Sequence, residues 1–304
     1  MILLVVQTLN GVQLGILLFL VAAGLTLVFG VMNFVNLAHG VQYMLGAYLG
    51  VSFSRLAGGF WGGLVLASLG AGLFGLALDG LIFRHLYRRR DLDQVLATFG
   101  VIITLNEVVR MVWGSAPLDM QLPGLLAGSF PLMGGLRYPV YRVAVTVAGL
   151  LVAGLLALVV SRTRAGMLIR AGASNPAMVA ALGVDIGRLF RLVFAVGAML
   201  AGFAGVLAAP LVSVEPGMGD SVLILAFVVI VIGGTGSIRG AFVAALLVGL
   251  VDTLGRSTIG DLAHAVLSAP AAARVGPALA SMLIYLVMAA VLALRPAGLF
   301  PARS

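Results

Sequence analysis

The 304-residue chain is 62% hydrophobic and only 9% charged, with a mean hydropathy of +1.19. Because so few polar side chains could not cover the surface of a water-soluble domain, the composition excludes a soluble protein and indicates a polytopic membrane protein. The net charge of +8 comes from arginine, since the chain has no lysine, and arginine in short loops indicates membrane topology, not nucleic acid binding. The absence of cysteine excludes disulfides and thiolate metal sites.

Nine apolar segments predict transmembrane helices. In chain order they are residues 11–31, 41–57, 60–82, 94–113, 140–160, 190–210, 221–235, 239–256 and 278–294. Their apolar runs are continuous and do not alternate, which favours helices over a β-barrel. The first run lacks the basic region and cleavage site of a removable signal peptide, so we expect it to be retained. The predicted fold is all-α, a helical bundle of about eight to ten spans in a single membrane domain over residues 1–304.

A polar interruption, GVMNFVNLAHGVQYMLGAY (residues 30–48), follows the first span in a region with no charged residue before Arg55. Its polar side chains recur at three-residue steps: Asn33, Asn36, His39 and Gln42. In lipid these groups need hydrogen-bond partners, so they must face protein or water. Two interpretations stay open: polar contacts between helices or a surface turn, and a discontinuity that presents polar groups to a transport pathway. A second break, GGTGSIRG (233–240), again separates two apolar runs.

Basic segments at residues 84–93 and 161–191 lie two spans apart and are both predicted to face the cytoplasm. Twelve of the 18 arginines fall on that side, which predicts an outside N-terminus and a cytoplasmic C-terminus. The segments 114–139, 213–220 and 256–277 are then predicted to be outside loops.

Charged residues within the spans lie near the predicted helix ends. Glu107 with Arg110 and Asp252 with Arg256 are spaced to pair on one helix face, and Asp79 is predicted to anchor at the membrane interface. A proton-coupled carrier needs a central carboxylate without a nearby arginine, and the sequence has no clear example. The chain also lacks the lysine of a nucleotide-binding P-loop.

The cytoplasmic segment contains a second informative motif, SNPAMVAALG (174–183). It predicts a short helix that Ser174 or Asn175 caps, that has Pro176 at its first position, and that Gly183 ends. The helix is too short to span a membrane. It could lie in the lipid interface or dock into a groove of another protein, and we favour docking.

Two segments, GLTLVFGVMNFVNLAHGVQYMLGAY (24–48) and IGGTGSIRGAFVAALLVGLVD (232–252), closely resemble the membrane subunits of branched-chain amino acid ABC importers, specifically the shorter of their two permeases. Residues 170–207 and 294–300 agree in order with the same family, so the resemblance covers nearly the whole chain. It implies a fold similar to that of the vitamin B12 and simple-sugar importers.

The resemblance also implies a function and its partners. The chain would be a non-catalytic permease subunit in the bacterial cytoplasmic (inner) membrane that imports branched-chain amino acids. It would assemble with a second permease, two ATPase subunits and an extracytoplasmic substrate-binding protein. The second permease would be a different chain, and a second copy of this chain stays open as the alternative. It would hold no cofactor itself, since ATP and Mg²⁺ would bind to the ATPase subunits. It would be surrounded by membrane lipid and would not bind nucleic acid.

The resemblance assigns residues to two roles. The residues implied for the substrate pathway are Asn33, Asn36, His39, Gly40 and Gln42. The residues implied to couple to the ATPase are Arg170, Asn175, Pro176, Ala180, Ala181, Leu182 and Gly183. Val41 stands where relatives commonly carry an acidic residue, which leaves the exact substrate open. The docking segment lacks the glutamate of other importer families, so its contact would rest on apolar packing and Arg170 or Arg188.

Three other functions stay open. The same architecture could serve urea or short amides, and only the pathway lining would distinguish these substrates. A secondary carrier or channel that works alone is less consistent with the short cytoplasmic helix and the missing carrier carboxylate. An intramembrane enzyme would need a catalytic set that the sequence does not contain.

Overall fold

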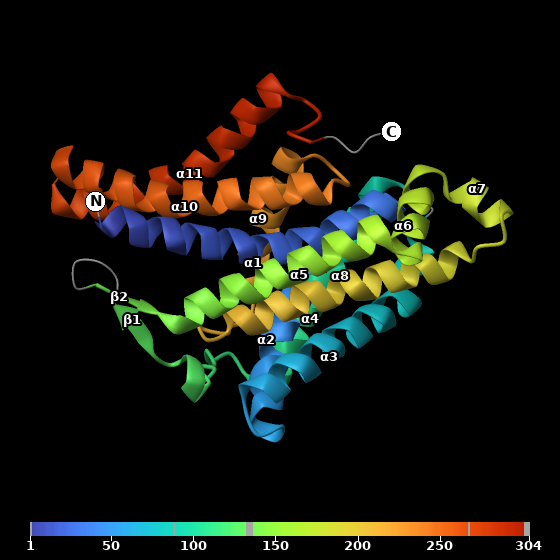
Figure 1. Cartoon of the computed structure of the whole chain (residues 1–304), viewed down its shortest axis with the longest axis horizontal. Helices are drawn as coiled ribbons and strands as arrows, with labels where there is room; N and C mark the ends of the chain where they lie inside the picture. The colour runs from blue at the N-terminus through green and yellow to red at the C-terminus, as the bar shows by residue number, and fades with distance from the viewer. Residues whose placement is uncertain (1, 88, 132–135, 267, 301–304) are drawn as a thin grey trace.

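The computed structural model describes residues 2–87, 89–131, 136–266 and 268–300. Its elements in chain order are α1 (Ile2–Met32), α2 (His39–Leu56), α3 (Phe60–Leu81), the 3-10 turn η1 (Phe83–His85), α4 (Asp91–Trp113), the 3-10 turn η2 (Gly124–Leu126), β1 (Ser129–Pro131), β2 (Arg137–Pro139), α5 (Val140–Arg162), α6 (Arg164–Ser174), α7 (Pro176–Ala181), α8 (Ile186–Ala208), α9 (Met218–Gly233), α10 (Ile238–Val266) and α11 (Ala269–Leu294). The β-hairpin lies at one end of the bundle, and α6 and α7 lie at the other (Figure 1).

Each of the nine predicted spans coincides with one helix, namely α1 to α5 and α8 to α11, and four of them extend one or two residues past the helix end. Seven of the helices in the described ranges are long and apolar enough to cross a membrane. The two others are α2, which carries the polar residues at its start, and α9, which is apolar but shorter. The prediction of an all-α polytopic membrane bundle is confirmed.

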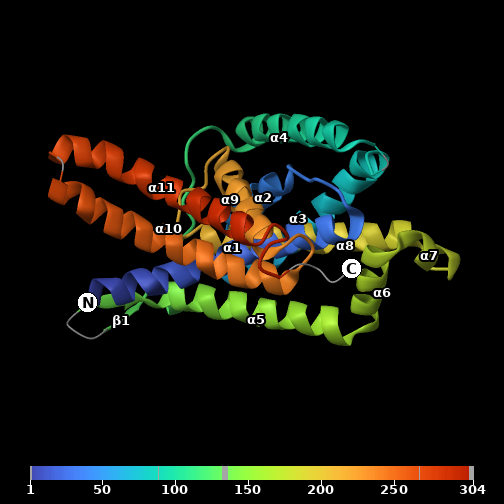
Figure 2. The same cartoon turned by 90° about the horizontal axis from the view of Figure 1, so that it is seen from above.

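The prediction of an outside loop at residues 256–277 is wrong. Helix α10 continues to Val266 and α11 already begins at Ala269, and the two helices run side by side (Figure 2). Charged residues such as Arg256 and Asp261 end the apolar run there, but they do not end the helix. Apolarity and helicity are separate properties, and the Ala-rich and Leu-rich sequence of this hairpin favours helix outside lipid as well.

Helix α2 runs through the interior of the bundle, where it packs against α3, α8 and α9. Its contacts depend on glycine. A Cβ atom added at Gly46 would lie 2.3 Å from Gly202 Cα on α8, and one added at Gly40 would lie 2.4 Å from the carbonyl oxygen of Gly219 on α9. Small residues of this kind let helix backbones approach directly, which replaces the hydrophobic driving force that is missing in lipid.

Segments predicted to share a side of the membrane lie at the same end of the bundle. Leu118 and Val214 form an antiparallel bridge, which joins the predicted outside segments 114–139 and 213–220. At the opposite end, Tyr87 and Ser174 line one cavity and so bring the two predicted cytoplasmic segments together. The arrangement agrees with the sidedness that the arginine distribution predicts.

Candidate functional site

The polar interruption after α1 is an irregular segment, as predicted. Helix α1 ends at Met32, and α2 begins only at His39. Asn33 adopts a left-handed conformation with φ of 50°, which asparagine tolerates better than most residues. The backbone N–H of Val35 donates to Gln94 Oε1 at 3.1 Å, which attaches the segment to α4.

Residues 33–38 turn back into the bundle. His39 Nε2 lies 3.1 Å from the carbonyl oxygen of Val21, and the His39 ring lies against Gly24, so both neighbours are in the middle of α1. Val21 precedes the end of α1 by about 11 residues, which corresponds to roughly 16 Å along a helix. Helix α2 therefore begins deep in the bundle.

The residues assigned to the pathway differ in exposure. Asn36, His39 and Gln42 have 0% exposure, Gly40 is buried against α9, and Asn33 is exposed. Neither amide atom of Asn36 or Gln42 has a hydrogen-bond partner within the described residues. An unpaired buried group costs about 1–3 kcal/mol, a penalty that water or a solute could relieve. Contact with a solute requires α2 to move from this position, so the pathway role stays a prediction.

The short helix α7 has the predicted start and end. Asn175, not Ser174, is the N-cap, since its Oδ1 accepts a hydrogen bond from the backbone N–H of Met178 at 2.9 Å. Pro176 occupies the first turn, and Gly183 follows the helix with φ of 86°. That left-handed conformation is favourable for glycine and strained for other residues.

Helix α7 presents an apolar surface away from the bundle. Of its side chains only Val179 is buried, whereas Met178 on the helix and Leu182, which directly follows it, are 63% and 76% exposed. Ala180 and Ala181 are exposed as well. Met178 was not among the predicted coupling residues, although its spacing of four from Leu182 is a helical signal that indicates a shared face.

Arg170, one of the residues predicted to couple to the ATPase, lies outside α7. Arg170 is part of α6, a helix that the sequence analysis does not predict. Its guanidinium donates a hydrogen bond to the carbonyl oxygen of Val160. Val160 is in the last turn of α5, where carbonyl groups lack helical partners. Arg170 therefore joins α6 to α5.

The cap of α7 gives a local prediction. Replacing Asn175 with alanine removes the hydrogen bond to the Met178 amide and should destabilise the helix start by about 1 kcal/mol. We expect hydrogen exchange at the Met178 amide to accelerate about fivefold, measured by mass spectrometry on the intact protein. Ser174→Ala is the matched control, because the Ser174 hydroxyl makes no hydrogen bond within the described residues. Equal exchange in both variants would contradict the capping role.

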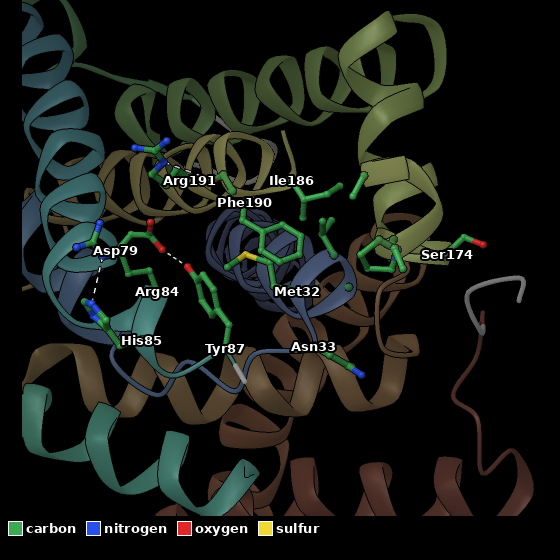
Figure 3. Close-up of a pocket in the computed structure, with 17 residues that line it drawn as sticks. Met32, Asn33, Asp79, Arg84, His85, Tyr87, Ser174, Ile186, Phe190 and Arg191 are labelled. Carbon is green, nitrogen blue, oxygen red and sulfur yellow. Dashed lines mark hydrogen bonds between the residues drawn. The ribbon is translucent and has the colours of Figure 1, made fainter. Parts of the chain in front are cut away.

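A cavity of about 1180 Å³ separates α7 from the end of α1 (Figure 3). Its wall contains Asn33 and also Pro176, Ala177 and Ala180 of α7. Two predicted sites that are far apart in the chain, the polar interruption and the docking segment, thus border one space. Among the five pathway residues, Asn33 alone lines a described cavity.

Asp79, which the sequence predicts to anchor at the membrane interface, also lines this cavity. Its side chain has 0% exposure, because α3 packs closely against α8 and the chain turns back over it through η1. The Tyr87 hydroxyl donates a hydrogen bond to Asp79 Oδ1. The two ion pairs that the sequence predicts are confirmed: Arg110 with Glu107 at 2.9 Å, and Arg256 with Asp252 at 2.8 Å.

Comparison with known proteins identifies the family. A model described as "Branched-chain amino acid transport system / permease component" matches residues 7–292. The high-affinity branched-chain amino acid transport system permease protein BraD of Pseudomonas aeruginosa is 32% identical over 272 residues, which cover 84% of this chain and 87% of BraD. LivH of Escherichia coli K12, which carries the same description, is 30% identical over 266 residues, covering 82% and 84%. No solved structure matches the chain. The chain therefore belongs to the branched-chain amino acid transport permease family.

Proposed function

We propose that the chain is the membrane-spanning permease subunit of an ATP-driven importer of branched-chain amino acids, in the cytoplasmic membrane of a bacterium. The family match over residues 7–292 carries this proposal. The subunit is not catalytic. Two ATPase subunits bind ATP and Mg²⁺, a second and different permease completes the membrane part, and an extracytoplasmic binding protein supplies the substrate.

Helix α7 is the proposed coupling element. Met178 and Leu182 form an exposed apolar pair on a helix that Val179 fixes to the bundle. Helix α7 packs against α6 and α8, and α8 packs in turn against α2. A rigid movement of α7 would be transmitted to α2, because backbone contacts such as Gly46 with Gly202 cannot be compressed.

The proposed consequence of this movement is exposure of the polar start of α2. Asn36 and Gln42 have unpaired amides in the buried position that the structure shows, and Asn33 already lines the cavity. Once exposed, amide groups and a neutral imidazole can bind the charged ends of an amino acid, while apolar walls suit an aliphatic side chain. Affinity at this site should be weak, because the substrate must leave.

Uptake in proteoliposomes tests the proposal. The complete importer, with both permeases, both ATPase subunits and the binding protein, should accumulate labelled leucine only in the presence of ATP. Urea should not accumulate. Accumulation of urea in place of leucine would favour the urea or amide importer, and leucine transport without ATP would favour a carrier that works alone. Either outcome would contradict the proposed function.

A further inference from the structure

The cavity beside α7 contains a buried carboxylate that is only partly satisfied. Tyr87 donates to Asp79 Oδ1, but Asp79 Oδ2 is buried and has no hydrogen-bond partner within the described residues. A buried acceptor of this kind is unfavourable unless a donor reaches it. Asp79 belongs to the cavity wall but is itself 0% exposed, so a donor from a ligand reaches this acceptor only once the side chain turns toward the cavity.

Two cationic groups line the same cavity. Arg84 lies in η1, and Arg191 lies on α8. Figure 3 shows both arginines on the same side of the cavity as Asp79. Neither arginine forms an ion pair with Asp79 in the described part of the chain, where the pairs join other residues. Both guanidinium groups thus keep donors for a carboxylate ligand.

The third component of the cavity is an apolar wall. Met32 at the end of α1, with Ile186 and Phe190 on α8, lines the cavity next to the charged groups (Figure 3). One carboxylate, two guanidinium groups and an apolar wall match the ammonium, the carboxylate and the side chain of an aliphatic amino acid. An anionic ligand such as a phosphate or a lipid headgroup would meet the buried Asp79 carboxylate, which disfavours it.

We propose that this cavity is a product site, in which an aliphatic amino acid binds from the cytoplasm as a zwitterion and slows further import. The inference rests on the proposed function, which supplies the amino acid. Pro176, Ala177 and Ala180 of α7 form part of the cavity wall. A bound ligand would contact α1, α8 and the coupling helix together, so it would oppose the movement of α7 that import requires.

Binding to the membrane complex of permeases and ATPases, without the binding protein, is the first test. In phosphatidylcholine nanodiscs, calorimetric titration should show leucine binding. Binding of 4-methylpentanoate, which lacks the ammonium, and of 3-methylbutylamine, which lacks the carboxylate, should be at least tenfold weaker. Arg191→Gln and Asp79→Asn should each weaken leucine binding at least tenfold. Arg191 is exposed, so its substitution should not disturb folding even if that of Asp79 does.

Matched controls come from an exposed pair at the start of α4. Arg90 lies 3.5 Å from Asp93, and neither lines the cavity. Arg90→Gln and Asp93→Asn should bind leucine as the wild type does. Unchanged leucine binding in Arg191→Gln, or binding of inorganic phosphate or anionic lipid in place of leucine, would overturn the proposal.

Transport supplies a second readout. Leucine preloaded on the cytoplasmic side of proteoliposomes should lower the initial uptake rate of the wild type at least threefold. In Arg191→Gln the ratio of rates with and without preload should approach one. No import by the wild type without preload would contradict the proposed function itself. Normal import that preloaded leucine does not slow would overturn only the product site.

Discussion

Replacing Met178 and Leu182 together with glutamate is expected to abolish coupling, lowering ATP-driven leucine uptake at least 100-fold. Both side chains are exposed, Met178 on α7 and Leu182 directly after it, so their loss should leave the bundle intact. At a docked ATPase, however, two carboxylates would be buried in an apolar groove, and burial without partners costs several kcal/mol. The measurement is co-purification of the ATPase subunits with the tagged permease, followed by uptake in proteoliposomes.

The matched control for this variant is Leu92→Glu. Leu92 is 64% exposed at the start of α4, at the same end of the bundle but away from α7. It should retain both ATPase subunits and near-normal uptake, and all variants should unfold at the temperature of the wild type. If the double variant keeps its ATPases and its uptake, α7 is not the coupling helix.

Gly46→Leu is expected to have the largest effect on stability. Any Cβ at this position would lie 2.3 Å from both Cα and the carbonyl oxygen of Gly202. These are backbone atoms that cannot rotate away, so α2 would have to separate from α8 along the interior of the bundle. Overpacking with side-chain adjustment alone costs about 1–3 kcal/mol, and a backbone shift should cost more. We expect loss of monodisperse protein, or a large fall in Tm, in detergent.

Gly100→Leu provides the comparison for this prediction. Gly100 is exposed on α4, and nothing lies within 4 Å of a Cβ added there. Its replacement should leave the Tm unchanged or slightly raised, because leucine favours helix over glycine. A Gly46→Leu protein as stable as Gly100→Leu would show that α2 and α8 are not in direct backbone contact.

Features with local causes could be predicted from the sequence. The limits of α7 follow from Asn175, Pro176 and Gly183, whose capping, φ restriction and left-handed preference act over a few residues. The break before α2 was predictable for the same reason, since polar residues interrupt an apolar run at residues 33–38. The helices themselves follow from continuous apolarity.

Features that depend on packing could not be predicted in this way. Asp79, Tyr87 and Arg191 meet in one cavity only because α3, η1 and α8 fold together, and no spacing in the sequence indicates it. The burial of Asn36 likewise follows from the path of α2 through the bundle. The extension of α10 to Val266 does not follow from hydropathy, because the helix continues past the end of the apolar run.

Site-directed labelling tests most directly the claim that α7 is the surface through which ATP hydrolysis acts. The chain has no cysteine, so Leu182→Cys and Leu125→Cys each give a single reactive thiol, on opposite ends of the bundle. Maleimide labelling should be fast at both positions in the permease pair alone. Assembly with the ATPase subunits should protect Leu182→Cys and leave Leu125→Cys unchanged. Equal labelling of Leu182→Cys with and without the ATPases would contradict the account.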